Sequence, residues 1–182
     1  MSAATRTSAL VGALLAVFAL AGCGGRSGVT PAKYVRSICS ALGVWKADVQ
    51  NAGKQLQASG AGTASPPAAK RDYVQFVSAL RAATQGAATA LQNAGTPAVS
   101  NGKQIADGLS GAFARGAQGL VNAEAQARAI PTANATVFEA GASAVTAQIR
   151  TALEGIATIT PRSSAALRAA ASRDAACQVL NG

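Results

Sequence analysis

Three cysteines, Cys23, Cys39 and Cys177, are the residues of this 182-residue chain best suited to covalent chemistry. The chain has no histidine, so the commonest general base and a common metal ligand are missing. It also has no CxxC motif, nucleophile elbow or phosphate-binding loop. The sequence therefore predicts that the protein is not an enzyme and has neither a cofactor nor a metal site. The seven carboxylates have no paired spacing: Asp48, Asp72, Asp107, Glu124, Glu139, Glu154 and Asp174.

Cys23 ends an apolar stretch that follows Arg6 and runs from residue 9 to residue 21. This layout is typical of an export signal, and the stretch is shorter than the roughly 20 residues that a helix needs to cross a bilayer. The Leu-Ala-Gly-Cys sequence at 20–23 resembles the lipobox of bacterial lipoproteins. That resemblance implies a signal peptide at 1–22, acyl chains such as palmitate on Cys23, and a lipid anchor on the extracytoplasmic face of the cell membrane. An ordinary signal peptide cut elsewhere is the alternative.

Cys39 and Cys177 remain as a pair once Cys23 is assigned to the lipid. Outside the cytoplasm, two such thiols are expected to be oxidised together. The sequence therefore predicts a disulfide that closes a loop of 138 residues.

The net charge of the whole chain is +9, and Arg6 is the only charged residue before position 23. The mature chain is therefore basic, which favours attraction to anionic lipid headgroups or to an acidic wall polymer. A solvated surface without a specific partner is the competing interpretation. Nucleic acid is not expected, because aromatic residues make up only 4% of the chain. No feature of the sequence identifies a protein partner.

Prolines recur every 30 to 35 residues, and most follow Ser or Thr, as at helix starts. Apolar residues between them recur at three- and four-residue steps, and no segment alternates with a period of two. We therefore predict an all-α fold, an Ala/Gly-rich bundle of four to five helices in residues 30–182, after a flexible tether at 23–29. A solenoid fits less well, because each unit resembles one long helix. The five predicted starts are Thr30-Pro31, Ser65-Pro66, Thr96-Pro97, Ile130-Pro131 and Thr160-Pro161.

Four glycines fall within the third predicted helix, at positions 108, 111, 116 and 119. They indicate either close helix packing or a softened helix. A membrane dimer face is disfavoured by the charged residues in this segment. The Asn-Ala-Thr sequence at 134–136 matches a glycosylation acceptor, but at a helix start it favours a cap.

Tyr34, Trp45 and Tyr73 are the aromatic residues that could line a pocket for a lipid or another apolar ligand. The competing interpretation is core packing, because all three fall on predicted apolar stripes. Glu124 and Arg128 have the spacing of an ordinary ion pair on the surface of a helix.

The predicted disulfide conflicts with a simple alternation of five helices. We measure the height of each cysteine along its helix from the proline that begins it, which is Pro31 for Cys39 and Pro161 for Cys177. The two cysteines would then differ in height by about 12 Å. Either the last segment is tilted or staggered, or the 95–103 stretch carries a crossover.

The 94–102 stretch, AGTPAVSNG, is the most distinctive internal motif. Together with the lipobox, Val35, Cys39 and Cys177-Gln178, it resembles actinobacterial small secreted lipoproteins of unknown function. The resemblance implies a helical secreted domain and supplies no activity. We therefore expect a non-catalytic binding or assembly role at the cell envelope, with a carrier of a small apolar ligand in the bundle core as the alternative.

Overall fold

The computed structural model describes residues 28–60, 64–157 and 164–180. The predicted signal peptide at 1–22, the lipid site Cys23 and most of the predicted tether lie outside these residues. In the described part of the chain there are six helices and no strand. They are α1 (Pro31–Ala58), α2 (Pro66–Asn93), α3 (Gly102–Ala129), α4 (Ala135–Ala157), α5 (Ala165–Ala171) and α6 (Ala175–Leu180).

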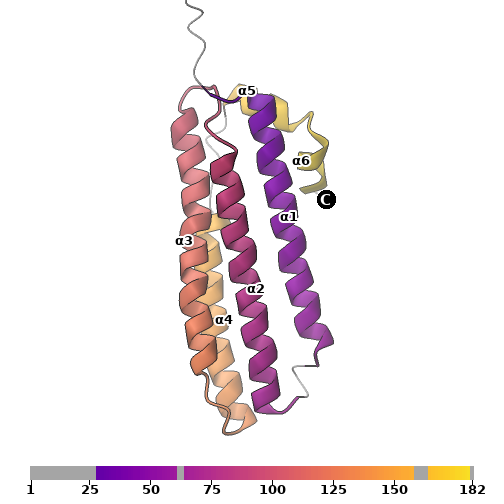
Figure 1. Ribbon diagram of the computed structural model, residues 1–182, viewed down its shortest axis with the longest axis vertical. Helices are drawn as coiled ribbons and strands as arrows, with labels where there is room; N and C mark the ends of the chain where they lie inside the picture. The colour runs from indigo at the N-terminus through magenta and orange to yellow at the C-terminus, as the bar shows by residue number, and fades with distance from the viewer. Residues whose placement is uncertain (1–27, 61–63, 158–163, 181–182) are drawn as a thin grey trace, which may run out of the picture.

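The four long helices lie side by side along the length of the molecule (Figure 1). Helix α3 packs against α2 and α4, α2 packs also against α1, and the short helices α5 and α6 pack on α1. The predicted all-helical bundle is therefore confirmed. We call the end where α1 begins and α5 lies the α5 end, and the end with the 130–134 connection the far end.

Two helices begin where the prolines predict. Helix α1 begins at Pro31, and the Thr30 hydroxyl accepts a weak hydrogen bond of 3.4 Å from the Lys33 N–H. Helix α2 begins at Pro66, although the side chain of the preceding serine makes no capping bond.

The other two starts inside the described residues were predicted wrongly. Helix α3 begins at Gly102 rather than at Pro97. Helix α4 begins at Ala135 rather than at the proline before it, and the Asn134 Oδ1 accepts a hydrogen bond of 2.9 Å from the Val137 N–H. This bond confirms Asn134 as a helix cap.

The chain before α1 pairs with the connection between α2 and α3. The Val29 N–H donates to the Thr96 carbonyl and the Ala98 N–H donates to the Val29 carbonyl, both at 2.8 Å. Val29 thereby forms an isolated parallel bridge with Pro97, which is fully buried. We call this arrangement the Val29 clamp. Val29 was assigned to the flexible tether, but its backbone is fixed at the α5 end of the bundle.

Glycine is required where the clamp closes. A Cβ at Gly102 would lie 2.0 Å from the Pro97 carbonyl oxygen, and one at Gly28 would lie 2.7 Å from the Thr96 carbonyl oxygen. Gly95 has a φ of +76°, in the region that side chains disfavour. Gly28 therefore permits the close approach of the two paired backbones, Gly95 leaves room for the Val29 side chain, and Gly102 lets the connection return closely to Pro97.

We expect Gly102→Ala to lower the free energy of unfolding by about 1–3 kcal/mol or more, because the new methyl group would overlap backbone. Gly108→Ala is the matched control in the same helix, since a Cβ there meets nothing within 4 Å. The control should be stabilised by about 0.5–1 kcal/mol. Chemical denaturation followed by circular dichroism measures both changes, and equal stability of the two variants would contradict the clamp.

The glycines of α3 serve different purposes. A Cβ at Gly116 would lie 2.8 Å from Ile156 Cδ1, and one at Gly119 would lie 2.7 Å from Ala152 Cβ. These two glycines therefore allow α3 and α4 to approach closely, whereas Gly108 faces open space. Close packing is confirmed for the contact with α4 only.

The predicted disulfide between Cys39 and Cys177 is present, with Cα atoms 4.9 Å apart. It forms because the last predicted helix is in fact two: α5 ends at Ala171 and α6 begins after a turn. Asp174 Oδ1 accepts a hydrogen bond of 3.0 Å from the Ala176 N–H and stabilises the start of α6. Helix α6 then lies beside α1 (Figure 1). The crossover alternative is wrong, because the connection between α2 and α3 stays at the α5 end and the two helices run in opposite directions beside each other (Figure 1).

The double variant Cys39→Ser/Cys177→Ser should lose up to about 5 kcal/mol of unfolding free energy, because the bond closes a 138-residue loop. Thermal unfolding with and without reductant measures this loss. Intact mass should rise by two hydrogens on reduction of the wild-type chain. An unchanged mass would show that the two thiols are not bonded.

Candidate functional site

The three aromatic residues proposed as a pocket do not converge. Tyr34 is buried in the apolar cluster that joins α1, α2, α3, α5 and α6, whereas Tyr73 is buried in a second cluster formed by α1 to α4. Trp45 packs edge-on against Phe113, with ring centroids 5.2 Å apart. The two tyrosines therefore belong to different parts of the core.

The polar atoms of Tyr73 and Trp45 form hydrogen bonds within the bundle. The Tyr73 hydroxyl lies 3.0 Å from the Ala142 carbonyl and 2.8 Å from Thr146 Oγ1. The Trp45 indole N–H donates to Thr84 Oγ1 at 3.2 Å. Burial raises the pKa of both Tyr34 and Tyr73, so both hydroxyls are neutral at physiological pH. These contacts are typical of core packing.

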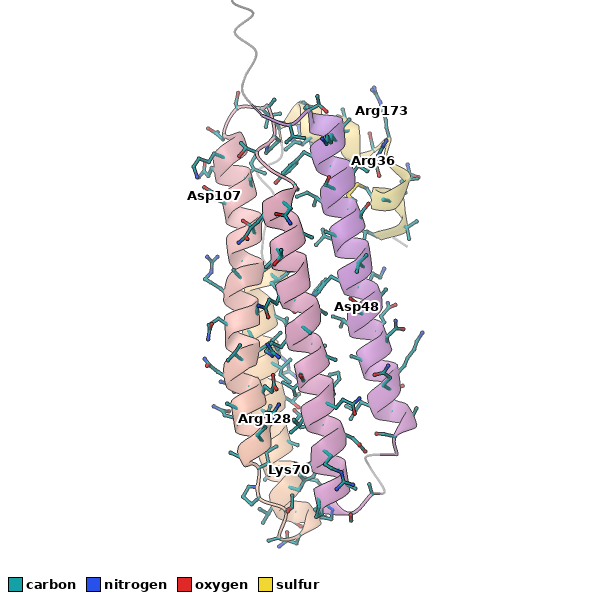
Figure 2. The ribbon with its side chains drawn as sticks, in the orientation of Figure 1. Arg36, Asp48, Lys70, Asp107, Arg128 and Arg173 are labelled. Carbon is teal, nitrogen blue, oxygen red and sulfur yellow. A yellow bond between two sulfur atoms is a disulfide. The ribbon has the colours of Figure 1, made fainter. Side chains whose placement is uncertain are left out.

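Trp45 also borders an open groove of about 840 Å³ between α1 and α2. The α2 side of the groove consists of alanines and Gly86, and the α1 side carries polar residues that include Asp48 (Figure 2). The groove lies on the surface of the bundle. The hollow beside Trp45 is thus a surface feature, whereas a carrier function would require an enclosed cavity.

A buried carboxylate is the strongest electrostatic feature that sequence reasoning missed. Glu124 on α3 is only 8% exposed and accepts hydrogen bonds from Arg81 Nε of α2, at 2.6 Å, and from Arg128 Nη2. Glu124 and Arg128 were expected to form an ordinary surface pair. The pair itself is confirmed. Its description as an ordinary surface pair was wrong, because Arg81 is a third member and the carboxylate is buried between α2 and α3.

The two arginines determine the protonation state of Glu124. The hydrogen bond from Arg128, assisted by Arg81, holds the pKa of Glu124 below its ordinary value, although burial acts in the opposite direction. A lowered pKa in the folded state means that the ionised carboxylate stabilises the protein above its unfolded-state pKa. This stabilisation is lost as the pH falls through the folded-state pKa.

Glu124→Gln should therefore cost about 1–3 kcal/mol of unfolding free energy at pH 7, because two charged hydrogen bonds are weakened. The difference from wild type should shrink as the pH is lowered below about 4. Denaturation at a series of pH values measures it. Glu139→Gln is the control on the exposed surface of α4, and its effect should stay within about 0.5 kcal/mol. A Glu124→Gln difference that does not change with pH would contradict the role of the ionised carboxylate.

Two further carboxylates form ion pairs with basic residues. Asp107 pairs with Lys103, and Asp174 pairs with Arg36 at 3.3 Å. The groove beside Trp45 contains one carboxylate, Asp48, among its lining residues. No group of three or more His, Cys, Asp or Glu side chains in the described ranges could hold a metal ion.

The α5 end carries basic residues beside the Val29 clamp. Arg36 and Arg173 border a groove of about 360 Å³ between α1 and α5–α6, and both lie at this end in Figure 2. Lys33 and Lys103 are exposed near the starts of α1 and α3. None of the helices in the described part of the chain has the length and hydropathy needed to cross a bilayer.

Comparison of the chain with protein-family models, with curated proteins and with solved structures finds no match. The resemblance to small secreted lipoproteins therefore stays a prediction.

Proposed function

We propose that this protein is a lipoprotein, anchored through Cys23 to the extracytoplasmic face of the cell membrane, which acts there by binding rather than by catalysis. The observation that carries the proposal is the Leu-Ala-Gly-Cys sequence at 20–23, which follows a short apolar stretch. The Val29 clamp adds an orientation, because it fixes where the chain leaves the bundle. Five Cα-to-Cα steps separate Cys23 from Gly28, so the chain between them spans at most about 18 Å.

This short reach supports one orientation. With Cys23 held in the lipid, the α5 end must stay close to the membrane surface, and the long axis of the bundle can point away from it. Lys33 and Arg173 at this end favour contact with anionic headgroups. Two or more acyl chains on one residue give stable rather than marginal attachment.

The choice of binding over catalysis is supported by the carboxylates among the described side chains, three of which are engaged in ion pairs. Glu124 is bonded to two arginines, and Asp107 and Asp174 pair with basic residues. A carrier of a small apolar ligand is less well supported, because Tyr34 and Tyr73 are packed in separate clusters and the groove beside Trp45 is open.

Cys23→Ser should move the protein from the membrane fraction to the soluble fraction of its own cells, because the acylated sulfur is lost. Cell fractionation, with mass spectrometry of the mature N-terminus, measures the change. Cys39→Ser/Cys177→Ser is the control, and it should remain membrane-bound although it also loses thiols. Membrane attachment of the Cys23→Ser variant, or a wild-type protein without acyl chains, would overturn the proposal.

A further inference from the structure

A shallow groove of about 740 Å³ lies along α2 at the far end of the bundle. We call it the basic groove. Its charged residues are Lys70 and Arg71 of α2 and Arg128 of α3, and its polar residues include Gln75 and Ser78. Lys70 and Arg128 lie toward this end in Figure 2. From Lys70 to Ala82 the groove extends about 18 Å along the helix.

No carboxylate neutralises the three cations from within the groove. Asp72 is next to Arg71 in sequence, but it lines a different hollow, between α1 and α2. Glu124 lies beneath Arg128 and bonds both Arg128 and Arg81, so this trio leaves one positive charge in excess. These three side chains together with Lys70 and Arg71 carry a net charge of +3, although Arg81 does not itself line the groove.

Two of the three cations are held in place by the fold. Lys70 Nζ donates to the carbonyl oxygen of Ile130, at the C-terminal end of α3, at 2.8 Å. Arg128 donates one N–H to Glu124, yet its side chain is 63% exposed. Their other N–H donors therefore have room to bond a ligand. Cations that are already oriented lose less conformational entropy when they bind an anion.

We propose that the basic groove binds an acidic polysaccharide of the cell envelope, through carboxylate or phosphate groups carried on the sugar chain. Lys70, Arg71 and Arg128 would pair with the anionic groups. The Gln75 amide and the Ser78 hydroxyl would bond the sugar hydroxyls. The elongated shape of the groove favours a polymer over a single small anion.

The choice of a polysaccharide over a lipid headgroup rests on the proposed function. Arg71 lies about 35 Å along α2 from the α5 end, where the chain would enter the membrane. This separation is several times the Debye length of about 8–10 Å at physiological salt. The basic groove therefore lies beyond the attraction of the headgroups when the bundle stands upright, and it faces the polymers outside the membrane.

The test uses the full chain in a neutral detergent, with polygalacturonate as the acidic polysaccharide and dextran as the neutral one. Isothermal titration calorimetry in low salt should show binding of polygalacturonate that high salt abolishes, and no binding of dextran. Lys70→Gln/Arg71→Gln should weaken this binding about tenfold or more, because charged hydrogen bonds to the anion are lost. This variant leaves Glu124 and its arginines intact.

Lys33→Gln/Lys54→Gln is the matched control, because it removes the same net charge from α1. Its affinity should change less than about twofold, since neither lysine lines the groove. Thermal unfolding of both variants verifies that the fold is retained. An equal loss in the two variants would show attraction by net charge alone and would overturn the proposal, as would no loss in either.

Two further probes separate the sources of the anionic group. Polyglutamate that binds as tightly as polygalacturonate, with the same dependence on Lys70 and Arg71, would overturn the choice of a sugar polymer. Binding to vesicles of phosphatidylcholine and phosphatidylglycerol that is lost in the Lys70→Gln/Arg71→Gln variant would overturn the choice of a polymer over a lipid. Because binding of polygalacturonate is measured in detergent without a membrane, a failure of that binding leaves the Cys23→Ser result unaffected, and the reverse also holds.

Discussion

Two backbone hydrogen bonds at Val29 connect the beginning of the described chain to the connection between α2 and α3. They are possible because Gly28, Gly95 and Gly102 leave room where side chains would collide or be strained. Pro97 stands between Thr96 and Ala98 in the chain, is fully buried, and has no N–H to donate. As a result the chain ahead of α1 has one fixed exit from the bundle. The proposed orientation at the membrane depends on that exit.

The bundle compensates for its small side chains in two ways. Gly116 and Gly119 let α3 approach α4 closely, so contact is gained by proximity rather than by large residues. The disulfide between Cys39 and Cys177 adds a covalent link between α1 and α6. At the far half of the bundle, Glu124 of α3 is joined to α2 through Arg81, and Arg128 of the same helix is its second partner. The same ion pairs orient one cation of the basic groove, so packing and surface charge are connected there.

Local sequence patterns predicted the helical class, the starts of α1 and α2, and the disulfide. They failed where a distant contact decides the local structure. Thr96-Pro97 has the residues of a helix start, but Val29, far away in sequence, holds it in an extended conformation. The last helix is broken because Asp174 caps a second one and α6 is tied to α1.

The candidate sites were predicted less completely than the fold. Trp45 does border a groove, yet Tyr34 and Tyr73 are separated into two clusters that periodicity alone could not distinguish. Arg81 was missed as a partner of Glu124 because 43 residues separate them. The basic groove was missed for the same reason, since Arg128 comes from another helix than Lys70 and Arg71. Its only local signal was the adjacent pair of basic residues.

Energy transfer from the bundle to the lipid surface tests most directly whether the α5 end faces the membrane. A donor dye would be attached either at Ser100→Cys, in the connection between α2 and α3, or at Ala133→Cys, in the connection at the far end. The acylated protein would be inserted in vesicles whose lipid headgroups carry the acceptor dye. The two positions are separated by about 40 Å, the length of α3. If the α5 end faces the membrane, we expect clearly stronger transfer from residue 100 than from residue 133. Equal transfer, or stronger transfer from residue 133, would contradict it.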